Sequence, residues 1–241
     1  IELKRKERVR IELQALADDT RKHHLMWDRF KALVPPAQVD FLTEVTIFTD
    51  GANRTTAFVE PTTANTNKWT LAFDVVDSFT VDDQLDIQVF PMTLLHEFGH
   101  LLFLNAKQTD SLKSTRPSKE ELKKVQAKCA PNYFSGIQCA KTHSYANRYW
   151  QRFWKGRPKP DTRSHDFVAN QANEFVSIYA RTNPDDDMAD TFVRFLLLNE
   201  KPQDTSLMVN QKILFFHDFP ELVRLREVVR ARIRHVYEAF K

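Results

Sequence analysis

The sequence predicts an α+β fold, with a small mixed sheet, a buried helix after it and a mainly helical C-terminal half. Three observations support this class. β-branched and aromatic residues gather at 45–49, 55–59 and 69–76, which favours strands. A nearly continuous apolar stretch predicts a buried helix over about 88–105. Apolar residues recur at helical spacing from about residue 166 onward.

The length and composition of the chain suit one packed unit. Its 241 residues are 42% apolar and 12% aromatic, which favours a globular core over disorder. We therefore expect a single domain over residues 1–241. Its expected parts are an N-terminal helical segment (1–35), the sheet with its following helix (36–105), a loop-rich insertion (106–165) and a helical half (166–241).

Element boundaries in the N-terminal half follow from breakers and turn residues. Apolar residues at helical spacing within 2–32 predict one long helix or two shorter ones, ending before Pro35. The strand at 45–49 ends at the turn pair Asp50-Gly51. The strand at 69–76 shows the clearest alternation of apolar and polar residues.

The C-terminal half alternates polar segments with helices. Residues 106–142 are polar and rich in lysine, which predicts a loop with one short helix near 118–128. Apolar residues from Leu222 to Val236 repeat at helical spacing and mark the last helix. The helices expected after the loop lie at 144–154, 187–199, 205–216 and 219–240.

Charge and hydropathy limit the possible partners. The 35 basic and 32 acidic residues leave a net charge of +3, which is too balanced to indicate a nucleic-acid partner. No apolar run approaches the ~20 residues of a membrane-spanning helix, so no membrane span is expected. The chain begins at Ile1, and we expect any signal segment to lie outside this sequence.

The most informative feature is His96-Glu97-Phe98-Gly99-His100, inside the predicted apolar helix. Residues four apart lie on one face of a helix, so both imidazoles can reach one ion. Two neutral nitrogen donors beside a carboxylate suit hydrolysis at Zn²⁺, with Glu97 taking a proton from a zinc-bound water. The competing interpretation is a buried helix with two incidental histidines. It is disfavoured because burying such polar groups without a role is costly.

A catalytic zinc needs a third protein ligand, and two downstream segments offer one. The run Asn-Glu-Phe-Val-Ser offers Glu174, in a pattern like the third-ligand helix of thermolysin-type enzymes. The acidic start of the following helix offers Asp186 or, as a weaker choice, Asp187. Asp190 lies four residues after Asp186, so one of the two can bind metal while the other accepts the free N–H of a ligand histidine. Aspartates at this place also cap a helix and complement its dipole.

Two motifs resemble a known family. His96-Glu-Phe-Gly-His100, together with Tyr179-x-x-Thr-Asn and Asp186-x-x-Ala-Asp190, looks like the catalytic domain of anthrax lethal factor and its bacterial relatives. Those proteins are gluzincin-type zinc metallopeptidases. The resemblance covers about 96–104 and 177–195. It implies a zincin-like fold in which Asp186 is a zinc ligand, Asp190 contacts a ligand, and the Tyr179 hydroxyl supports the oxyanion.

One ligand position departs from that family. This chain carries Asp186 where the family carries Glu. An aspartate is shorter by one methylene, so the helix that bears it must approach the metal more closely. Asp is a ligand in other zincins, and the change is therefore compatible with activity.

The only two cysteines are Cys129 and Cys139. Pro131 and Gly136 lie between them and can turn the loop so that the two meet in a disulfide, while two free thiols remain the alternative. A disulfide would imply an exported protein. The stretch 129–154 also looks similar to exported bacterial zinc peptidases, which implies a secreted, periplasmic or cell-envelope protein with its signal segment removed.

We therefore expect a zinc-dependent metallopeptidase that hydrolyses peptide bonds as a monomer. Its substrate would be a protein or peptide, and the strand segment Thr70–Val75 could pair with an extended substrate. Three alternatives remain. The chain could be a binding module with a weakened site, a zinc hydrolase acting on another bond, or a toxin-like protease specific for one host protein.

Overall fold

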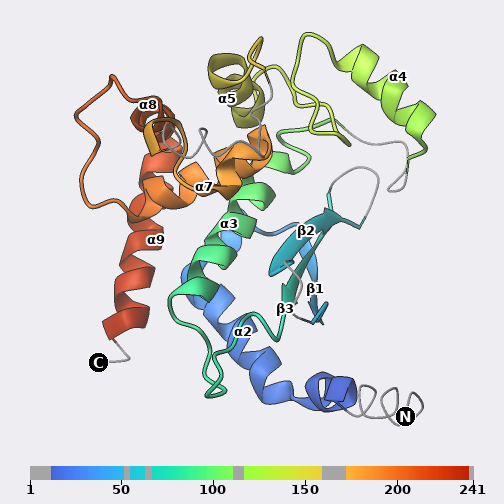
Figure 1. The fold of residues 1–241 in the computed structure, drawn as a ribbon, viewed down its shortest axis with the longest axis vertical. Helices are drawn as coiled ribbons and strands as arrows, with labels where there is room; N and C mark the ends of the chain where they lie inside the picture. Colours follow the sequence, from blue (N-terminus) through green and yellow to red (C-terminus); the bar gives the residue numbers. More distant parts are fainter. Residues whose placement is uncertain (1–11, 52–54, 63–66, 111–116, 159–171, 239–241) are drawn as a thin grey trace.

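The computed structural model describes residues 12–51, 55–62, 67–110, 117–158 and 172–238. Within these ranges the chain is α+β, as the sequence predicts. Figure 1 shows helix α3 (Val89–Leu104) in the middle of the molecule, between the sheet and the C-terminal helices. The predictions for residues 2–11, and those for 159–171, concern segments outside the described residues.

The N-terminal segment forms two helices, which agrees with one of the two arrangements predicted. Residues 12–18 are helical, and α2 (Thr20–Leu33) follows after Asp19. The Asp19 side chain accepts a hydrogen bond from the Lys22 amide at 3.1 Å and so caps α2. The last turn of α2 lies against α9 (Pro220–Glu238), where the Arg232 guanidinium donates to the carbonyls of Lys31 and Ala32 at 3.1 and 3.3 Å.

The sheet is small and mixed, as predicted. Its strands are β1 (Leu42–Phe48), β2 (Ala57–Pro61) and β3 (Trp69–Asp74), in the order β1-β3-β2. β3 runs parallel to β1 and antiparallel to β2. All six residues of β3 are buried, whereas β1 and β2 are only partly buried.

The prediction that Thr70–Val75 could pair with a substrate is wrong. β3 is the central strand, and both of its edges are already hydrogen-bonded within the sheet. Apolar alternation shows that a strand is buried, but it does not show whether the strand is central or at an edge. Among the described strands, the free edges belong to β1 and β2.

Helix α3 is positioned by apolar contacts on several sides. It packs against β2, α2, α5 (Tyr145–Phe153) and α7 (Pro184–Leu197), and the contact with α7 is the most extensive of these. Gly99 makes that contact close. A Cβ atom added at Gly99 would lie 3.3 Å from Ala189 Cα, so a larger residue would push the two helices apart.

The helices of the C-terminal half follow the predicted order. α4 (Lys119–Cys129) begins with a capping box between Ser118 and Glu121. α7 begins at Pro184, three residues before the predicted start at 187, because Asn183 caps its amides and proline is well tolerated in the first turn. α8 (Met208–His217) and α9 complete the half, and they enclose an aromatic core made by Phe103, Tyr149, Phe192, Phe195, Phe215 and Phe216.

Candidate metal centre

The two histidines of the motif lie on one face of α3. Their Nε2 atoms are 3.0 Å apart, and each imidazole is largely buried between α3 and α7. The helix holds them there because an i, i+4 pair stands one turn apart on the same face. Glu97, between them in sequence, is also buried.

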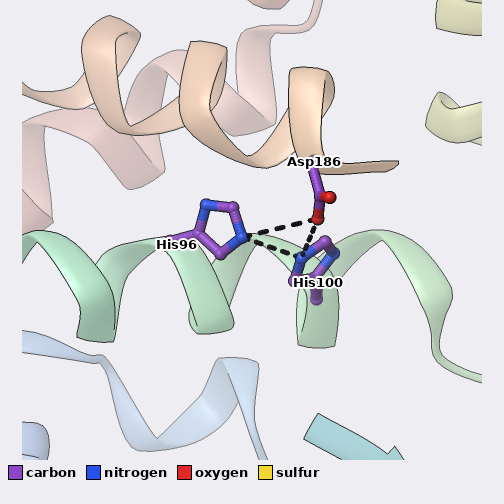
Figure 2. A group of neighbouring side chains, drawn as sticks. All are labelled: His96, His100 and Asp186. Atoms are coloured by element: carbon purple, nitrogen blue, oxygen red, sulfur yellow. Dashed lines mark hydrogen bonds and ion pairs between the residues drawn. The ribbon is translucent and has the colours of Figure 1, made fainter. Parts of the chain in front are cut away.

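Asp186, from the first turn of α7, is the third member of the group. Its Oδ1 atom lies 3.4 Å from His100 Nε2 and 3.8 Å from His96 Nε2. Figure 2 shows the two imidazoles on α3 and the Asp186 carboxylate on the facing helix converging on one point. The sequence offered two helices for this position, and the structure brings the acidic start of α7 to the histidines.

The spacing of these three atoms fits a small cation. Four ligands at 2.0–2.1 Å around a tetrahedral ion stand about 3.3 Å from one another. The observed separations of 3.0, 3.4 and 3.8 Å bracket that value. Two imidazole nitrogens with one carboxylate oxygen form a donor set that suits Zn²⁺. The residues present therefore fit the metal that the motif predicts.

Hydrogen bonds on the outer side of the group orient its members. Asp190 Oδ1 accepts from His96 Nδ1 at 2.6 Å. Because the proton of this imidazole lies on Nδ1, its Nε2 lone pair faces His100 and Asp186. The other oxygen of Asp190 accepts from the Ser177 hydroxyl, which in turn accepts from the Ala180 amide at 2.9 Å.

The Asp186 carboxylate is fixed in a similar way. Its Oδ2 atom accepts from Thr182 Oγ1 at 2.7 Å and from Asn183 Nδ2 at 2.6 Å, which leaves Oδ1 for the group. Asn183 Oδ1 meanwhile caps the amides of Asp185 and Asp186 at 2.9 Å. The contributions of Thr182 and Asn183 were not predicted from the sequence. Asn183 stands directly before Pro184, and this pair is a helix-start signal that could have identified it.

The electrostatics of the group favour positive charge. Burial lowers the pKa of His100, but Asp186 and then Glu97 outweigh it, and the pKa lies above its ordinary value. Burial raises the pKa of Asp186, but hydrogen bonds from His100 and Thr182 outweigh it, and the pKa lies below its ordinary value. Burial raises the pKa of Glu97, and the two histidines oppose that shift. A cation among these side chains would be stabilised by the same field.

The neighbours of Asp186 have different environments. Burial raises the pKa of Asp185 to about 6, although His100 and a hydrogen bond with Tyr133 act in the opposite direction. Asp187 is fully buried, and its Oδ2 lies 2.8 Å from Lys212 Nζ. Asp187 also accepts from Trp154 Nε1 at 2.8 Å, which fixes its carboxylate away from the group. Only Asp186 of the three joins the histidines.

Glu174, the other predicted ligand, has a different partner. Its Oε1 lies 2.5 Å from Arg157 Nη1 in an ion pair. Glu174 is not part of the group that His96, His100 and Asp186 form.

Tyr179 lies at the mouth of the group. It begins a short 3-10 helix, η2 (Tyr179–Arg181), and its ring centroid is 5.7 Å from that of His96. The residue is 56% exposed and lines both flanking cavities. Partial burial and then the charges of Asp186 and Glu97 raise the pKa of Tyr179 to about 12, which keeps the hydroxyl protonated as a donor at neutral pH.

Two cavities, of about 500 and 450 Å³, flank the group. Both are lined by Ala57, His96, Glu97 and Tyr179, so they meet at the candidate site. The first extends past Ser177 toward the last turns of α7, and the second extends along β2. A longer ligand could therefore cross the site and occupy both.

A further cavity of about 830 Å³, larger than the two flanking ones, lies elsewhere. It is bounded by α2 and β1, with Trp27 and Ile47 in its walls, and none of the predicted site residues lines it. This cavity is therefore not connected with the chemistry of the motif by its size alone.

The structure contains the predicted disulfide between Cys129 and Cys139, with Cα atoms 5.4 Å apart. The loop that it closes begins at the end of α4 and contributes Ser135, Ile137 and Gln138 to the smaller of the two flanking cavities. The sequence analysis predicted the bond but not its closeness to the site.

Comparisons with models of protein families, with curated proteins and with solved structures found no match. The proposed function therefore rests on the geometry of the site.

Proposed function

We propose that this protein is a zinc metallopeptidase that hydrolyses peptide bonds. The observation that carries the proposal is the convergence of His96 Nε2, His100 Nε2 and Asp186 Oδ1 on one point, with Glu97 buried beside them. Bound Zn²⁺ would supply a Lewis acid that polarises a carbonyl and acidifies water. The resemblance of the two motifs to lethal-factor-type peptidases agrees with this proposal.

Glu97 is the proposed general base. It lines both flanking cavities together with His96, and its charge acts on His100, so its side chain lies beside the proposed metal ligands. In this role it takes a proton from the attacking water and passes it to the amine that leaves. The proposed base and the two histidine ligands belong to one buried helix, which fixes their spacing.

Tyr179 and Asp190 are proposed to assist. The Tyr179 hydroxyl is a protonated donor that can reach the developing negative charge on the carbonyl oxygen. Asp190 holds the ring of His96 in one orientation through its 2.6 Å hydrogen bond. In this proposal Tyr179 donates a hydrogen bond to the substrate, whereas Asp190 acts through its hydrogen bond with His96.

The substrate is proposed to lie along β2 rather than β3. β2 has a free edge within the described sheet, and its residues line the smaller flanking cavity. An extended peptide can add to such an edge by backbone hydrogen bonds. This position would place its backbone beside the candidate metal group.

The disulfide supports a location outside a reducing cytosol, and we propose that the protein is exported. No helix of the described residues has the length and apolar character needed to cross a membrane.

Replacing Glu97 by Gln tests the proposal. The amide keeps the shape of the side chain but cannot take a proton, so cleavage of casein by the zinc-loaded protein should fall by about 10²–10⁴-fold. Metal analysis should still find zinc in the variant. Glu200→Gln, at an exposed position that lines neither flanking cavity, is the matched control and should keep wild-type activity.

Two outcomes would contradict the proposal. Normal cleavage by Glu97→Gln would remove the general base from the mechanism. Wild-type protein that takes up zinc but cleaves no peptide would favour the binding module or a hydrolase of another bond.

A further inference from the structure

The loop between the two cysteines is a small, well-ordered hairpin, which we call the disulfide hairpin (residues 129–139). Phe134 pairs with Cys139 in an antiparallel bridge. At the tip, the Ser135 amide donates to the Gln138 carbonyl at 3.0 Å, and Gly136 has φ +93°, a conformation that favours glycine. The tip is therefore a turn with a fixed backbone.

The base of the disulfide hairpin is anchored in the core. The Tyr133 amide donates to Asn147 Oδ1 on α5 at 2.9 Å, and the Tyr133 carbonyl accepts from the Ala140 amide at 2.9 Å. The Cys139 carbonyl accepts from the Asp110 amide at 2.9 Å. The disulfide closes the hairpin at this base, so its tip is held in one place relative to α3 and α5.

The tip and the candidate metal centre line the same cavity. Ser135, Ile137 and Gln138 line the cavity of about 450 Å³ together with residues of β2. His96, Glu97 and His100 also line it. A peptide bound along β2 would therefore share this cavity with the tip of the disulfide hairpin.

Ile137 is the apolar side chain that the tip presents. It is 46% exposed, in a turn whose other tip residues are polar or glycine. Phe58 and Val59 lie on the β2 wall of the same cavity, so an apolar group entering it would have apolar neighbours on two sides. Glu60 is an exposed acid on that wall, and it would repel an acidic group.

We propose that the disulfide hairpin determines the substrate specificity of the peptidase, with Ile137 packing against an apolar side chain of the peptide bound along β2. This inference rests on the proposed function. Ile137 touches the substrate but takes no part in the chemical step. It should therefore affect selectivity and leave the metal group unchanged.

The test compares cleavage profiles of the zinc-loaded chain. Wild type, Ile137→Ala and Ile137→Asp are incubated with blocked decapeptides in which each position in turn is Leu, Phe, Ala or Asp, and products are identified by mass spectrometry. At one substrate position, the ratio of kcat/KM for Leu over Ala should fall at least about tenfold in Ile137→Asp, the range set by one apolar contact in a pocket. Zinc content should stay at the wild-type value.

Val81→Asp is the matched control, because Val81 is fully exposed and lies on none of the cavity walls described above. It should leave the profile unchanged. If both Ile137 variants keep the wild-type profile at every position, the hairpin inference is overturned while the proposed function stands. If wild type cleaves no peptide, the proposed function fails and the inference fails with it.

The double variant Cys129→Ser/Cys139→Ser tests closure of the hairpin. Without the covalent bond only hydrogen bonds hold the tip, and selectivity should shift in the same direction as in Ile137→Ala, with zinc content retained. A correctly folded double variant with the wild-type cleavage profile would show that the disulfide does not fix the position of the hairpin tip. If the double variant does not fold, the Ile137 variants decide the question.

Discussion

Helices α3 and α7 bring their side chains to the candidate metal centre in different ways. On α3 the separation of His96 and His100 is set by the helix itself, because residues four apart share a face. Asp186 lies on α7, and its place depends on how the two helices dock. Local geometry can be predicted from a sequence motif, whereas docking depends on contacts made by many other residues.

The docking contact is unusually close at one point. Gly99, in the middle of the motif, lets α7 approach until its Ala189 Cα is 3.3 Å from where a Cβ would stand. Gly99 and Asp186 therefore both lie at the contact between α3 and α7, the two helices that form the candidate site.

The largest expected effect would break the anchoring of α7 on α8. Lys212 and Asp187 are both fully buried and lie 2.8 Å apart, and the lysine also stands 3.7 Å above the Phe175 ring. Lys212→Met leaves a buried carboxylate without its cation and should lower the free energy of unfolding by about 3–5 kcal/mol. Urea denaturation measures this change.

The double variant Lys212→Met/Asp187→Leu is the companion experiment. Replacing both charges by apolar groups should recover most of the lost stability. A single variant as stable as wild type would show that this ion pair does not hold α7.

The next effect concerns the ligand that α7 is proposed to contribute. Asp186→Ala removes one of the three proposed ligands and should weaken zinc binding by more than about 100-fold, beyond the range expected for residues that only contact ligands. Competition with a chromogenic chelator measures the affinity. Glu174→Ala is the matched control and should bind zinc as wild type does, because Glu174 pairs with Arg157. Weakened zinc binding in Glu174→Ala, with wild-type binding in Asp186→Ala, would identify Glu174 as the ligand.

Gly99→Val would sharpen the comparison by separating the two helices. The added atoms overlap Ala189 and Phe192, and overpacking of this kind costs about 1–3 kcal/mol. Zinc affinity should fall together with the denaturation midpoint, and Gly99→Ala should give a smaller change of both. Unchanged zinc affinity in the valine variant would separate helix docking from ligand placement.

The smallest expected effect is on orientation of a ligand. Asp190→Asn removes the charge that fixes the His96 ring and should reduce zinc affinity by about 10–100-fold without a comparable loss of stability. Asp82→Asn, at an exposed position that lines neither flanking cavity, serves as the control. Equal affinities for the two variants would mean that Asp190 does not orient the histidine.

The sequence predicted the strongly periodic parts of the fold. The motif helix was predicted at about 88–105 and is found at Val89–Leu104, because a long apolar stretch leaves few alternatives. The central position of β3 was not predictable, since strand order depends on contacts between distant segments. The prediction that residues near 70–75 would bind a substrate failed for this reason.

The acidic run on α7 shows the same limit at the level of single residues. Successive residues of a helix point about 100° apart, so Asp185, Asp186 and Asp187 must face three directions. The motif resemblance favoured Asp186 over Asp187, but the sequence gives no side-chain direction; the fold gives Asp185 to Tyr133, Asp186 to the histidines and Asp187 to Lys212. Only the rotation of α7 against its neighbours decides which is which.

The contact between Arg232 and the end of α2 has a consequence for biosynthesis. The carbonyls of Lys31 and Ala32 receive their donor from a residue about 200 positions later. During synthesis this junction can close only after α9 has been made, so the end of α2 stays without its guanidinium donor until then.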